Sequence, residues 1–377
     1  MKQPSDKLIY NIQNENFFIH INNKFENTIL KEIENLKSDN KIFFVYDSNI
    51  NPKILKNLIK FLRKTGNIII IKKLNGNKFN KNRKQLFEII DHLIKEKFTK
   101  KSIMLSMGGG VIGDLSALAA SLYLRGLIYF HIPTTMTSIV DSCIGGKTGI
   151  NHNNVINSIG NYYHAKSVFI DYNIIKDLPQ REYNAGISEI LKCCIINKGL
   201  NINYLRKNKK LIVEKNMSLI KKLIFFALKT KIKFFKDDVF EKKKRLNLNF
   251  GHTFAHAIEM SMIKNKKEIF RHGEAVGLGM LCELKIANKY KLFKDLSLTL
   301  KELNLPNHIK VNSIKEKNLL QNKIYKNVFL DKKKINKNPR YIHIKNIGNC
   351  SIKELTNYHK INDVIFDLIK VVETIKN

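Results

Sequence analysis

Short apolar runs alternate with amphipathic stretches over the first 170 residues, and this alternation limits the folds open to the chain. Five runs are predicted buried strands: KIFFVYD (41–47), NIIII (67–71), SIMLSM (102–107), LIYFHIP (127–133) and SVFID (167–171). PKILKNLIKFLRK and RKQLFEIIDHLIKEK, between them, have helical spacing. LIYNI and FFIHI predict an opening hairpin. The pattern predicts an α/β fold with a Rossmann-like, doubly wound and mostly parallel sheet.

The pattern changes near residue 180 to long helices. The helical stretches are AGISEILKCCIINKGL, SLIKKLIFFALKTKIKFFKDD, GHTFAHAIEMSMI and GEAVGLGMLCELKIANKY. With a boundary near Pro179, we expect an α/β domain over residues 1–178 and a mainly α-helical domain over residues 179–377. The Asn- and Lys-rich pieces NGNKFNKNRK and KKKINKNPR are predicted loops.

The net charge is unusually positive for a globular chain. The 377 residues include 67 Lys and Arg against 32 Asp and Glu, for a formal charge of +35, yet only eight are arginines. A nucleic-acid groove more often concentrates arginine among aromatic residues. The abundance of Lys, Asn and Ile instead indicates AT-rich codon drift over solvated surfaces. We therefore expect no specific nucleic-acid partner, although non-specific attraction to polyanions follows from the charge.

Cysteine usage and the N-terminal sequence indicate the compartment. The five cysteines, at positions 143, 193, 194, 282 and 350, form no CxxC pair. An odd count without a disulfide framework favours a reduced, cytoplasmic protein. MKQPSDKLIYNIQ lacks the apolar core of a signal peptide, and no apolar run approaches membrane-spanning length. We expect no association with a membrane.

SMGGGVIGD (106–114) follows a predicted strand and opens a predicted helix. Gly108, Gly110 and Gly113 fit the pattern G-x-G-x-x-G. Its glycines let the backbone approach a pyrophosphate, and the helix start offers N–H groups to it. A tight strand-to-helix turn without a ligand is the alternative. Asp114 is either a helix cap or a site residue at the carboxyl end of a strand.

A second glycine-rich stretch, IPTTMTSIVDSCIGGKTGINHNN (132–154), contains groups suited to an anion. Lys147 follows Gly145 and Gly146, so a cation lies where backbone can approach an anion closely. The plainer interpretation is a glycine-rich loop with a solvated lysine.

The helical half contains potential metal ligands. His252 and His256 are four residues apart in GHTFAHAIE, and RHGEAVGLG contributes His272. Glu189 and Lys192 share a helix face in ISEILK. One carboxylate with two imidazoles is a common catalytic zinc arrangement. Spacing alone does not say which two histidines bind a metal, and buried histidines on one helix face are the alternative.

These motifs together resemble the 3-dehydroquinate synthase family, the sugar phosphate cyclases of the shikimate pathway. The resemblance rests on GGGVIGDLSALAAS, RG, PTT, VDSCIGGKTGIN, LPQREYNAGISEILK, LNFGHTFAHAIE, HGEAVGLGM and LDKK, which have the family's order and approximate spacing over residues 40–345. It implies conversion of 3-deoxy-D-arabino-heptulosonate 7-phosphate to 3-dehydroquinate and phosphate. The implied route is transient oxidation with NAD+, β-elimination of phosphate, reduction and intramolecular aldol closure.

The resemblance also implies roles for individual residues. Glu189, His252 and His272 would hold one divalent metal, Zn2+ or Co2+, with His256 handling protons beside it. Cations for the substrate's phosphate and carboxylate would be Arg125, Lys147, Lys192, Lys231, Arg245 and either Lys332 or Lys333. Polar substrate contacts would be Asp141, Asn157 and Asn249. The implied cofactor positions are Asp47, Gly109, Gly110, Val111, Ile112, Gly113, Asp114, Thr134, Thr135, Lys147, Ile156, Ile174, Ile175, Lys176 and Asp177. A homodimer is expected on the same ground.

The chain departs from the family's pattern on the cofactor side. A Gly-Glu-x-x-Lys loop is usual there, whereas this chain has Asn77 and Asn80 at the charged positions. Ile156 replaces the lysine of a Gly-Lys-Asn motif. Each lost charge-assisted bond is worth roughly 1.5–3 kcal/mol, so we predict weakened NAD affinity. Lys78, Lys81 or the general positive field would offer some compensation.

Three rival functions fit parts of the sequence. Another sugar phosphate cyclase would share the metal and NAD sites, but the presence of Arg125, Asn157 and Arg245 together favours the dehydroquinate reaction. A metal-dependent polyol dehydrogenase would release NADH. A nucleic-acid-binding protein rests only on charge and on runs such as EKKKR (241–245).

Overall fold

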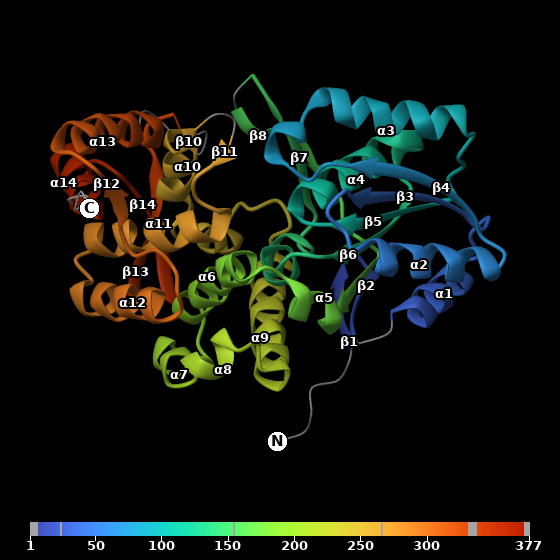
Figure 1. Ribbon diagram of the computed structural model, residues 1–377, viewed down its shortest axis with the longest axis horizontal. Coiled ribbons are helices and arrows are strands. Elements are labelled where there is room, and N and C mark those ends of the chain that lie inside the picture. The colour runs from blue at the N-terminus through green and yellow to red at the C-terminus, as the bar shows by residue number, and fades with distance from the viewer. Residues whose placement is uncertain (1–6, 23–24, 154, 265–266, 331–337, 373–377) are drawn as a thin grey trace, which may run out of the picture. The chain divides into compact units, whose positions relative to one another are not determined.

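The computed structural model describes residues 7–22, 25–153, 155–264, 267–330 and 338–372. Its internal contacts divide the chain into two compact units (Figure 1). The first comprises Met1–Pro179 and Lys231–Phe240, and the second comprises Gln180–Thr230 and Glu241–Asn377. The sequence led us to expect a single boundary after residue 178. It did not indicate that Lys231–Phe240 belongs to the first unit.

The first unit is built on a seven-stranded sheet with the strand order β1-β2-β9-β6-β5-β3-β4. The strands are β1 (Lys7–Ile12), β2 (Glu15–Asn22), β3 (Lys41–Asp47), β4 (Ile68–Leu74), β5 (Ile103–Gly108), β6 (Ile128–Pro133) and β9 (Ser167–Asp171). Strands β1 and β2 form an antiparallel hairpin, and the other neighbours are parallel. The predicted hairpin and mostly parallel sheet are confirmed.

Helices cover both faces of this sheet. They are α1 (Glu26–Asn35), α2 (Pro52–Lys64), α3 (Arg83–Lys95), α4 (Gly110–Leu122) and α5 (Tyr172–Asp177). In Figure 1, α1 and α2 lie on one face, and α3 and α4 lie on the other. The central strands contribute Phe44, Leu105 and Phe130, all fully buried, to one core. Each such side chain contributes about 1.5–3 kcal/mol through burial, which explains the continuous apolar runs of these strands.

A second hairpin lies between β6 and β9 in the chain, where the sequence predicted no strands. Strands β7 (Lys147–His152) and β8 (Val155–Tyr162) pair antiparallel. A Cβ atom on Gly160 would lie 2.1 Å from the backbone oxygen of Thr148, so the two strands pack backbone to backbone. Most of β8 is exposed, and it therefore lacks the apolar alternation by which a half-buried strand is recognised.

The second unit is mainly helical, as predicted. Its helices are α6 (Gln180–Ile196), α7 (Ile202–Lys207), α8 (Lys209–Val213), α10 (His252–Ser261), α11 (His272–Ile286), α12 (Tyr290–Glu302), α13 (Ile314–Val328) and α14 (Tyr358–Leu368), with most of α9 (Met217–Phe235). Three two-stranded pairs accompany them: β10 (Ile263–Lys264) with β11 (Lys267–Glu268), β12 (Ile309–Val311) with β15 (Ile369–Val371), and β13 (Arg340–Asn346) with β14 (Asn349–Glu354).

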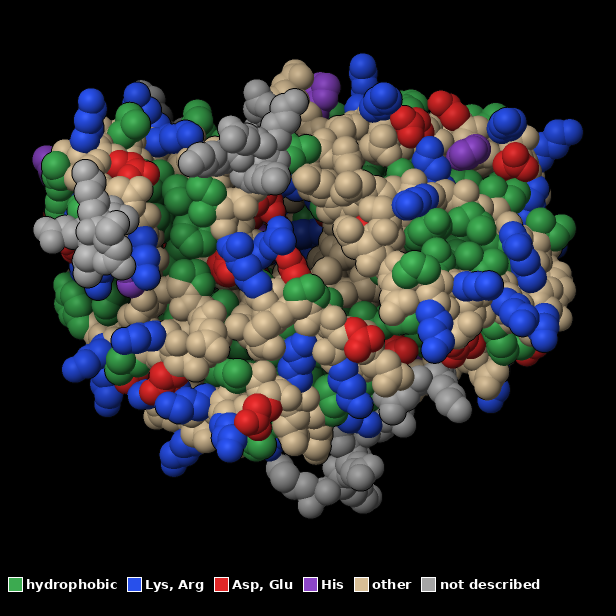
Figure 2. All heavy atoms as spheres, viewed as in Figure 1, with side chains coloured by type: hydrophobic (Ala, Val, Ile, Leu, Met, Phe, Trp, Pro, Cys, Tyr) green, Lys and Arg blue, Asp and Glu red, His purple; other side chains and the backbone are tan. Residues whose placement is uncertain are grey.

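The surface carries the charge anticipated from the composition. Lys and Arg side chains are scattered over the face shown in Figure 2 and do not gather into one stripe. Among the helices that the structure describes, none is both long enough and apolar enough to cross a bilayer.

Candidate active site

The glycine-rich turn joins β5 to α4. Gly108 ends β5, Gly109 is the N-cap of α4, and Gly110 is the first helical residue. A Cβ atom on Gly109 would lie 3.1 Å from Thr135 Cγ2, and one on Gly110 would lie 3.2 Å from Ser142 Oγ. These contacts leave little room for side chains. The N–H groups of the first turn, which lack acceptors within a helix, are thus accessible to an anionic group at the start of α4.

Two residues of this segment, Ile112 and Gly113, pack against residues of the sheet. Ile112 is fully buried, and a Cβ atom on Gly108 would lie 2.6 Å from its Cβ. A Cβ atom on Gly113 would lie 3.1 Å from Cε1 of His131. Ile112 and Gly113 therefore fix α4 against the sheet, whereas Val111 and Asp114 are only partly buried.

Neighbouring strand ends flank the turn. Thr134 follows β6 and donates its backbone N–H to Gly108 O at 3.0 Å. Asp47 ends β3, and its Oδ1 accepts the N–H of Asn49 at 3.0 Å. Asp47, Thr134 and Thr135 thus lie at the carboxyl ends of parallel strands, the edge at which doubly wound sheets bind ligands.

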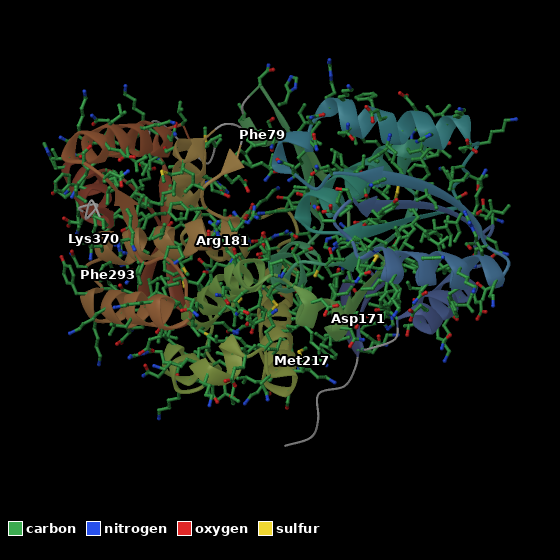
Figure 3. All side chains as sticks on the ribbon, viewed as in Figure 1. Phe79, Asp171, Arg181, Met217, Phe293 and Lys370 are labelled. Carbon is green, nitrogen blue, oxygen red and sulfur yellow. The ribbon has the colours of Figure 1, made fainter. Side chains whose placement is uncertain are left out.

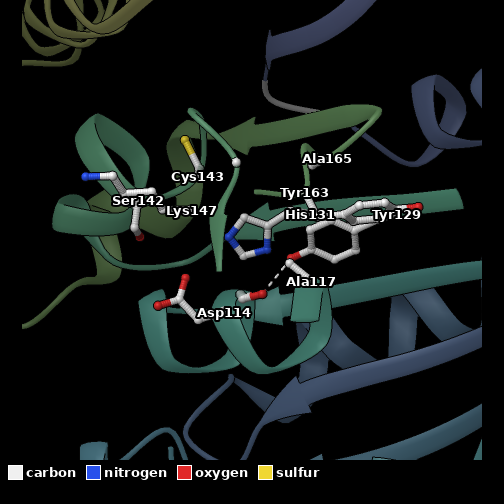
Figure 4. A pocket seen from close by; sticks show the side chains of 11 residues that line it. Asp114, Ala117, Tyr129, His131, Ser142, Cys143, Lys147, Tyr163 and Ala165 are labelled. Atoms are coloured by element: carbon white, nitrogen blue, oxygen red, sulfur yellow. Dashed lines mark hydrogen bonds between the residues drawn. The ribbon is translucent and has the colours of Figure 1, made fainter. Parts of the chain in front are cut away.

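A chain of buried polar groups lies beneath the turn, and no sequence pattern indicated it. Ser106 Oγ lies 2.8 Å from Tyr129 OH and 2.7 Å from His131 Nδ1. Tyr129 OH donates to Gly113 O at 3.1 Å (Figure 4), and His131 Nε2 lies 3.4 Å from Ser138 Oγ. These hydrogen bonds connect β5, β6 and α4 below the predicted cofactor site.

A small cavity next to this chain brings two predicted site residues together. Its volume is about 20 Å3, and Asp114 and Lys147 both line it, with His131 and Ser142 (Figure 4). This volume is sufficient for about one water molecule. Burial raises the pKa of the Asp114 carboxyl, and the Lys81 ammonium opposes that rise. A carboxylate and a cation from separate motifs therefore share one polar cavity.

His131 predicts a measurable acid sensitivity of the fold. Burial lowers its pKa to about 3, although the hydrogen bond from Ser106 opposes the shift. Below the unfolded pKa of about 6.5, only the unfolded state takes up the proton, so stability falls as pH falls from 6.5 toward 3. Between about pH 7 and pH 5 this group should cost about 1–2 kcal/mol of unfolding free energy.

Urea unfolding of wild type and His131→Gln at both pH values tests this: the variant should lose less stability in acid. Equal losses in the two proteins would contradict the prediction.

Asp141 and Lys231, predicted as separate substrate contacts, form an ion pair. Lys231 Nζ lies 2.9 Å from Asp141 Oδ1 and donates to Ile144 O at 3.3 Å. Lys231 is buried and belongs to the part of α9 that lies in the first unit. Asp141 lies in a π-helical turn, Ser138–Ser142. The ion pair therefore holds the Asp141 carboxylate in place, in the turn that follows the motif Pro133-Thr134-Thr135.

Arg125 and Asn157 are exposed and have left-handed backbone conformations. Their φ angles are +65° and +50°, and the φ of Leu124 is +50°. Such angles are unusual for residues other than glycine, and each costs on the order of 1–2 kcal/mol. The hydrogen bond that Tyr163 OH donates to Leu127 O, at 2.5 Å, helps to hold the segment that follows Arg125.

The remaining predicted cofactor residues lie farther from the glycine turn in sequence. The side chains of Ile174 and Ile175 are buried. Lys176 and Asp177 are exposed at the end of α5, and Ile156 is half-buried in β8.

The second unit brings the three predicted metal ligands together. Glu189 lies in α6, and His252 and His272 are the first residues of α10 and α11. One ligand atom from each lies within 4.8 Å of the others. Glu189 is 1% exposed, and its Oε1, 3.6 Å from His272 Nε2, accepts no hydrogen bond from the described residues. A divalent cation would stabilise such a carboxylate between imidazoles, so the residues fit a metal.

Hydrogen-bond geometry assigns the imidazole tautomers. His252 Nδ1 lies 3.2 Å from Phe250 O, and His272 Nδ1 lies 3.3 Å from Glu259 Oε1. With Nδ1 as the donor in both rings, each Nε2 keeps its lone pair for a metal. Glu259 was not predicted to be a site residue, although Glu259 follows His252 by seven residues and so shares its helix face.

Three glycines allow the helices that bear these ligands to approach closely. Gly251, the N-cap of α10, has a φ of +82°. A Cβ atom on Gly279 of α11 would lie 2.0 Å from Gly251 O, and one on Gly273 would lie 1.8 Å from Ala185 O of α6. Helix α11 therefore packs backbone to backbone against both α10 and α6.

A bidentate ion pair joins the starts of α6 and α11. Arg181, labelled in Figure 3, donates from Nε to Glu274 Oε1 at 2.8 Å and from Nη2 to Glu274 Oε2 at 2.7 Å. Glu274 Oε2 also accepts the N–H of Arg271 at 2.8 Å. This planar pairing fixes the first turn of α11, and so its first residue His272, relative to α6.

Two other predicted residues, Lys192 and His256, lie beside the cluster. Lys192 is fully buried, with Nζ 2.5 Å from Glu189 Oε2. The ring of His256 lies 5.8 Å from that of His252, centroid to centroid, beside the three ligand candidates. Arg245 and Asn249 lie in the short helical segment Lys244–Asn249 that precedes α10. Lys332 and Lys333 lie outside the described residues.

Residues 68–185 match the family model of the 3-dehydroquinate synthase N-terminal region, and residues 186–334 match that of the C-terminal region. The chain belongs to the 3-dehydroquinate synthase family. The 3-dehydroquinate synthase of Pelagibacter ubique (strain HTCC1062) is 37% identical over 368 residues, which cover 94% of this chain and 96% of the relative.

Solved structures of sugar phosphate cyclases share the fold. A 2-deoxy-scyllo-inosose synthase complexed with carbaglucose-6-phosphate, NAD+ and Co2+ has a TM-score of 0.84 at 22% identity, covering 96% of this chain and 99% of its own. The 2-epi-5-epi-valiolone synthase from Streptomyces hygroscopicus subsp. jinggangensis 5008, with NAD+ and Zn2+ bound, has a TM-score of 0.75 at 22% identity, covering 87% and 90%.

Proposed function

We propose that this chain converts 3-deoxy-D-arabino-heptulosonate 7-phosphate to 3-dehydroquinate and phosphate, the second step of the shikimate pathway. The proposal rests on the cluster of potential metal ligands in the second unit. In a member of the 3-dehydroquinate synthase family, Glu189, His252 and His272 present three ligand atoms within 4.8 Å of one another. A group of this composition is suited to one divalent ion with positions left for substrate.

The metal would be Zn2+ or Co2+, the ions bound in the two structural neighbours. When bound, it supplies Lewis acidity that lowers the pKa of a coordinated substrate hydroxyl. Lys192, buried with its Nζ 2.5 Å from Glu189 Oε2, would offer an ammonium to the substrate. His256 lies one helical turn from His252 and accepts and returns protons at its imidazole.

The glycine turn of the first unit would bind NAD+, which both structural neighbours contain. The constraints at Gly109 and Gly110 leave only backbone where a pyrophosphate would approach the start of α4. NAD+ supplies a reversible oxidation, so it is regenerated in each turnover. Because Asn77 and Ile156 stand at usually charged positions, we expect weaker NAD+ binding than in relatives that keep those charges.

The substrate carries a phosphate and a carboxylate, and the cations named above would bind them. Lys147 lines the cavity that Asp114 also lines, and Lys231 is fixed by Asp141. Arg125 and Arg245 would supply planar, bidentate contacts that lysine does not reproduce. Asn157 and Asn249 would donate neutral hydrogen bonds to substrate hydroxyls.

The assembly and the compartment are part of the proposal. We expect a homodimer that works in the cytoplasm, with a small sugar phosphate as its partner and no sequence-specific nucleic acid. Family membership supports the dimer, and cysteine usage supports a reducing compartment.

Substrate choice tests the proposal. Purified protein is supplied with NAD+, Zn2+ or Co2+, and either the heptulosonate phosphate or glucose 6-phosphate. Release of phosphate and formation of the carbocyclic product are followed together. We expect both products from the heptulosonate phosphate and neither from glucose 6-phosphate. Turnover of glucose 6-phosphate alone would instead indicate a different sugar phosphate cyclase.

A further inference from the structure

Lys81 is a buried cation with a fixed backbone. It is 8% exposed and directly precedes Asn82, the N-cap of α3. Its N–H donates to Lys78 O at 3.1 Å, and its carbonyl accepts the N–H of Asn151 at 2.8 Å. These bonds place Lys81 between the start of α3 and the β7–β8 hairpin.

The ammonium of Lys81 contacts two residues from other parts of the first unit. It donates to Oδ2 of Asp114, in α4, and to Oδ1 of Asn157, in β8. The N–H of Asn157 also donates to Asn151 Oδ1 at 2.9 Å. One side chain therefore joins the glycine-turn helix to the hairpin that carries a predicted substrate contact.

The chemistry of these contacts is specific to a cation. A buried ammonium needs acceptors, and here it has a carboxylate and an amide oxygen. Burial raises the pKa of Asp114, while Lys81 favours the ionised carboxylate. Asn157 has a φ of +50°, an uncommon conformation that needs surrounding contacts to persist. A neutral side chain at position 81 would lose the charge that binds Asp114 and Asn157, so both side chains would be held less firmly in position.

Asn80 does not perform this role. Its Nδ2 donates to Asn75 O at 3.1 Å, which closes the local turn. The positive charge thus lies at position 81, one residue beyond the position at which the family pattern usually has lysine.

We propose that Lys81 is a positioning residue of the cofactor site, which holds Asp114 in place for NAD+, ties α4 to the hairpin through Asn157, and replaces the charge that Asn80 lacks. This inference rests on the proposed function, because NAD+ is the ligand whose binding it supports.

Calorimetric titration of the whole chain with NAD+ tests the proposal. Lys81→Asn should weaken binding about 10- to 100-fold, the equivalent of one charge-assisted hydrogen-bond network. Adding Asn80→Lys to that variant should restore affinity to within about 5-fold of wild type, because the charge returns one residue away. Asn80→Lys alone should tighten binding less than about 3-fold, since an ammonium is already present. Lys84→Asn, an exposed change of the same charge in α3, should stay within about 2-fold.

Amide hydrogen exchange in the absence of NAD+ gives an independent measurement. Lys81→Asn should accelerate exchange in β8 and leave α2 unchanged, because the Lys81 ammonium binds Asn157 in β8 and neither of its two acceptors lies in α2. Unchanged exchange in β8, or NAD+ affinity like that of wild type, would overturn the proposal.

If Lys81→Asn does not fold, Asn80→Lys alone decides: tightening by more than about 10-fold would show that Lys81 does not supply the missing charge. Failure of the wild type to bind NAD+ would count against the proposed function, and the exchange result would still decide the role of Lys81 at Asp114 and Asn157.

Discussion

Replacing Glu189 with glutamine is expected to lower kcat by at least about 1,000-fold, together with a loss of tight metal binding. A metal contributes several kcal/mol of transition-state stabilisation, and about 4 kcal/mol corresponds to this factor. The amide keeps the shape of the side chain but removes the charge that faces His272 Nε2 at 3.6 Å. Steady-state kinetics and metal content after dialysis give the two readouts.

A matched variant separates this effect from a general disturbance of α6. Glu182 lies on the same helix and forms an ion pair with Arg271 at 2.6 Å, with 28% of its side chain exposed. Glu182→Gln should change kcat less than about 2-fold, as is usual for partly exposed pairs. Full activity or one bound ion per chain in Glu189→Gln would show that Glu189 is not a ligand.

Gly279→Ala should reduce the free energy of unfolding by about 3 kcal/mol and weaken metal binding with it. The new methyl group would lie 2.0 Å from Gly251 O and 2.9 Å from Ala255 N. Both are backbone atoms of α10 or its cap, so α10 and α11 must separate. His252 and His272 begin these two helices, and their separation opens the predicted metal site. Urea unfolding and zinc titration measure the two effects.

Gly277→Ala is the internal control for this prediction. It lies in the same helix, but its nearest neighbour would be the flexible Leu300 Cδ2 at 3.1 Å. Alanine is favoured over glycine in a helix by up to about 1 kcal/mol, which offsets the small adjustment of Leu300. We expect little change in stability or metal affinity. Similar losses in both variants would contradict the packing argument.

The sheet of the first unit was predictable because its strands are buried. Strands β3 and β9 have the predicted bounds, since continuous apolar runs mark strands that are covered on both faces. The β7–β8 hairpin was not predictable in this way. It is held by its ladder and by the close packing of Gly160 on Thr148, neither of which produces an apolar period.

The family resemblance implied the candidate metal ligands, but several residues that the folded chain buries beside the candidate sites could not be recognised from the sequence. His252 and His272 stand in recognisable glycine-flanked motifs. Glu259, His131 and Lys81 acquire their environments through contacts between distant segments. A lysine beside Asn80 looks like one more solvated charge in a lysine-rich chain, and only the fold shows it between Asp114 and Asn157.

We propose that this chain closes a carbocycle without net oxidation. The most direct test is the stoichiometry of one complete reaction, with phosphate, 3-dehydroquinate and nicotinamide absorbance followed in the same sample. We expect one phosphate and one dehydroquinate for each heptulosonate phosphate consumed, with no lasting NADH signal. Accumulation of one NADH per substrate, without dehydroquinate, would contradict it and identify a dehydrogenase.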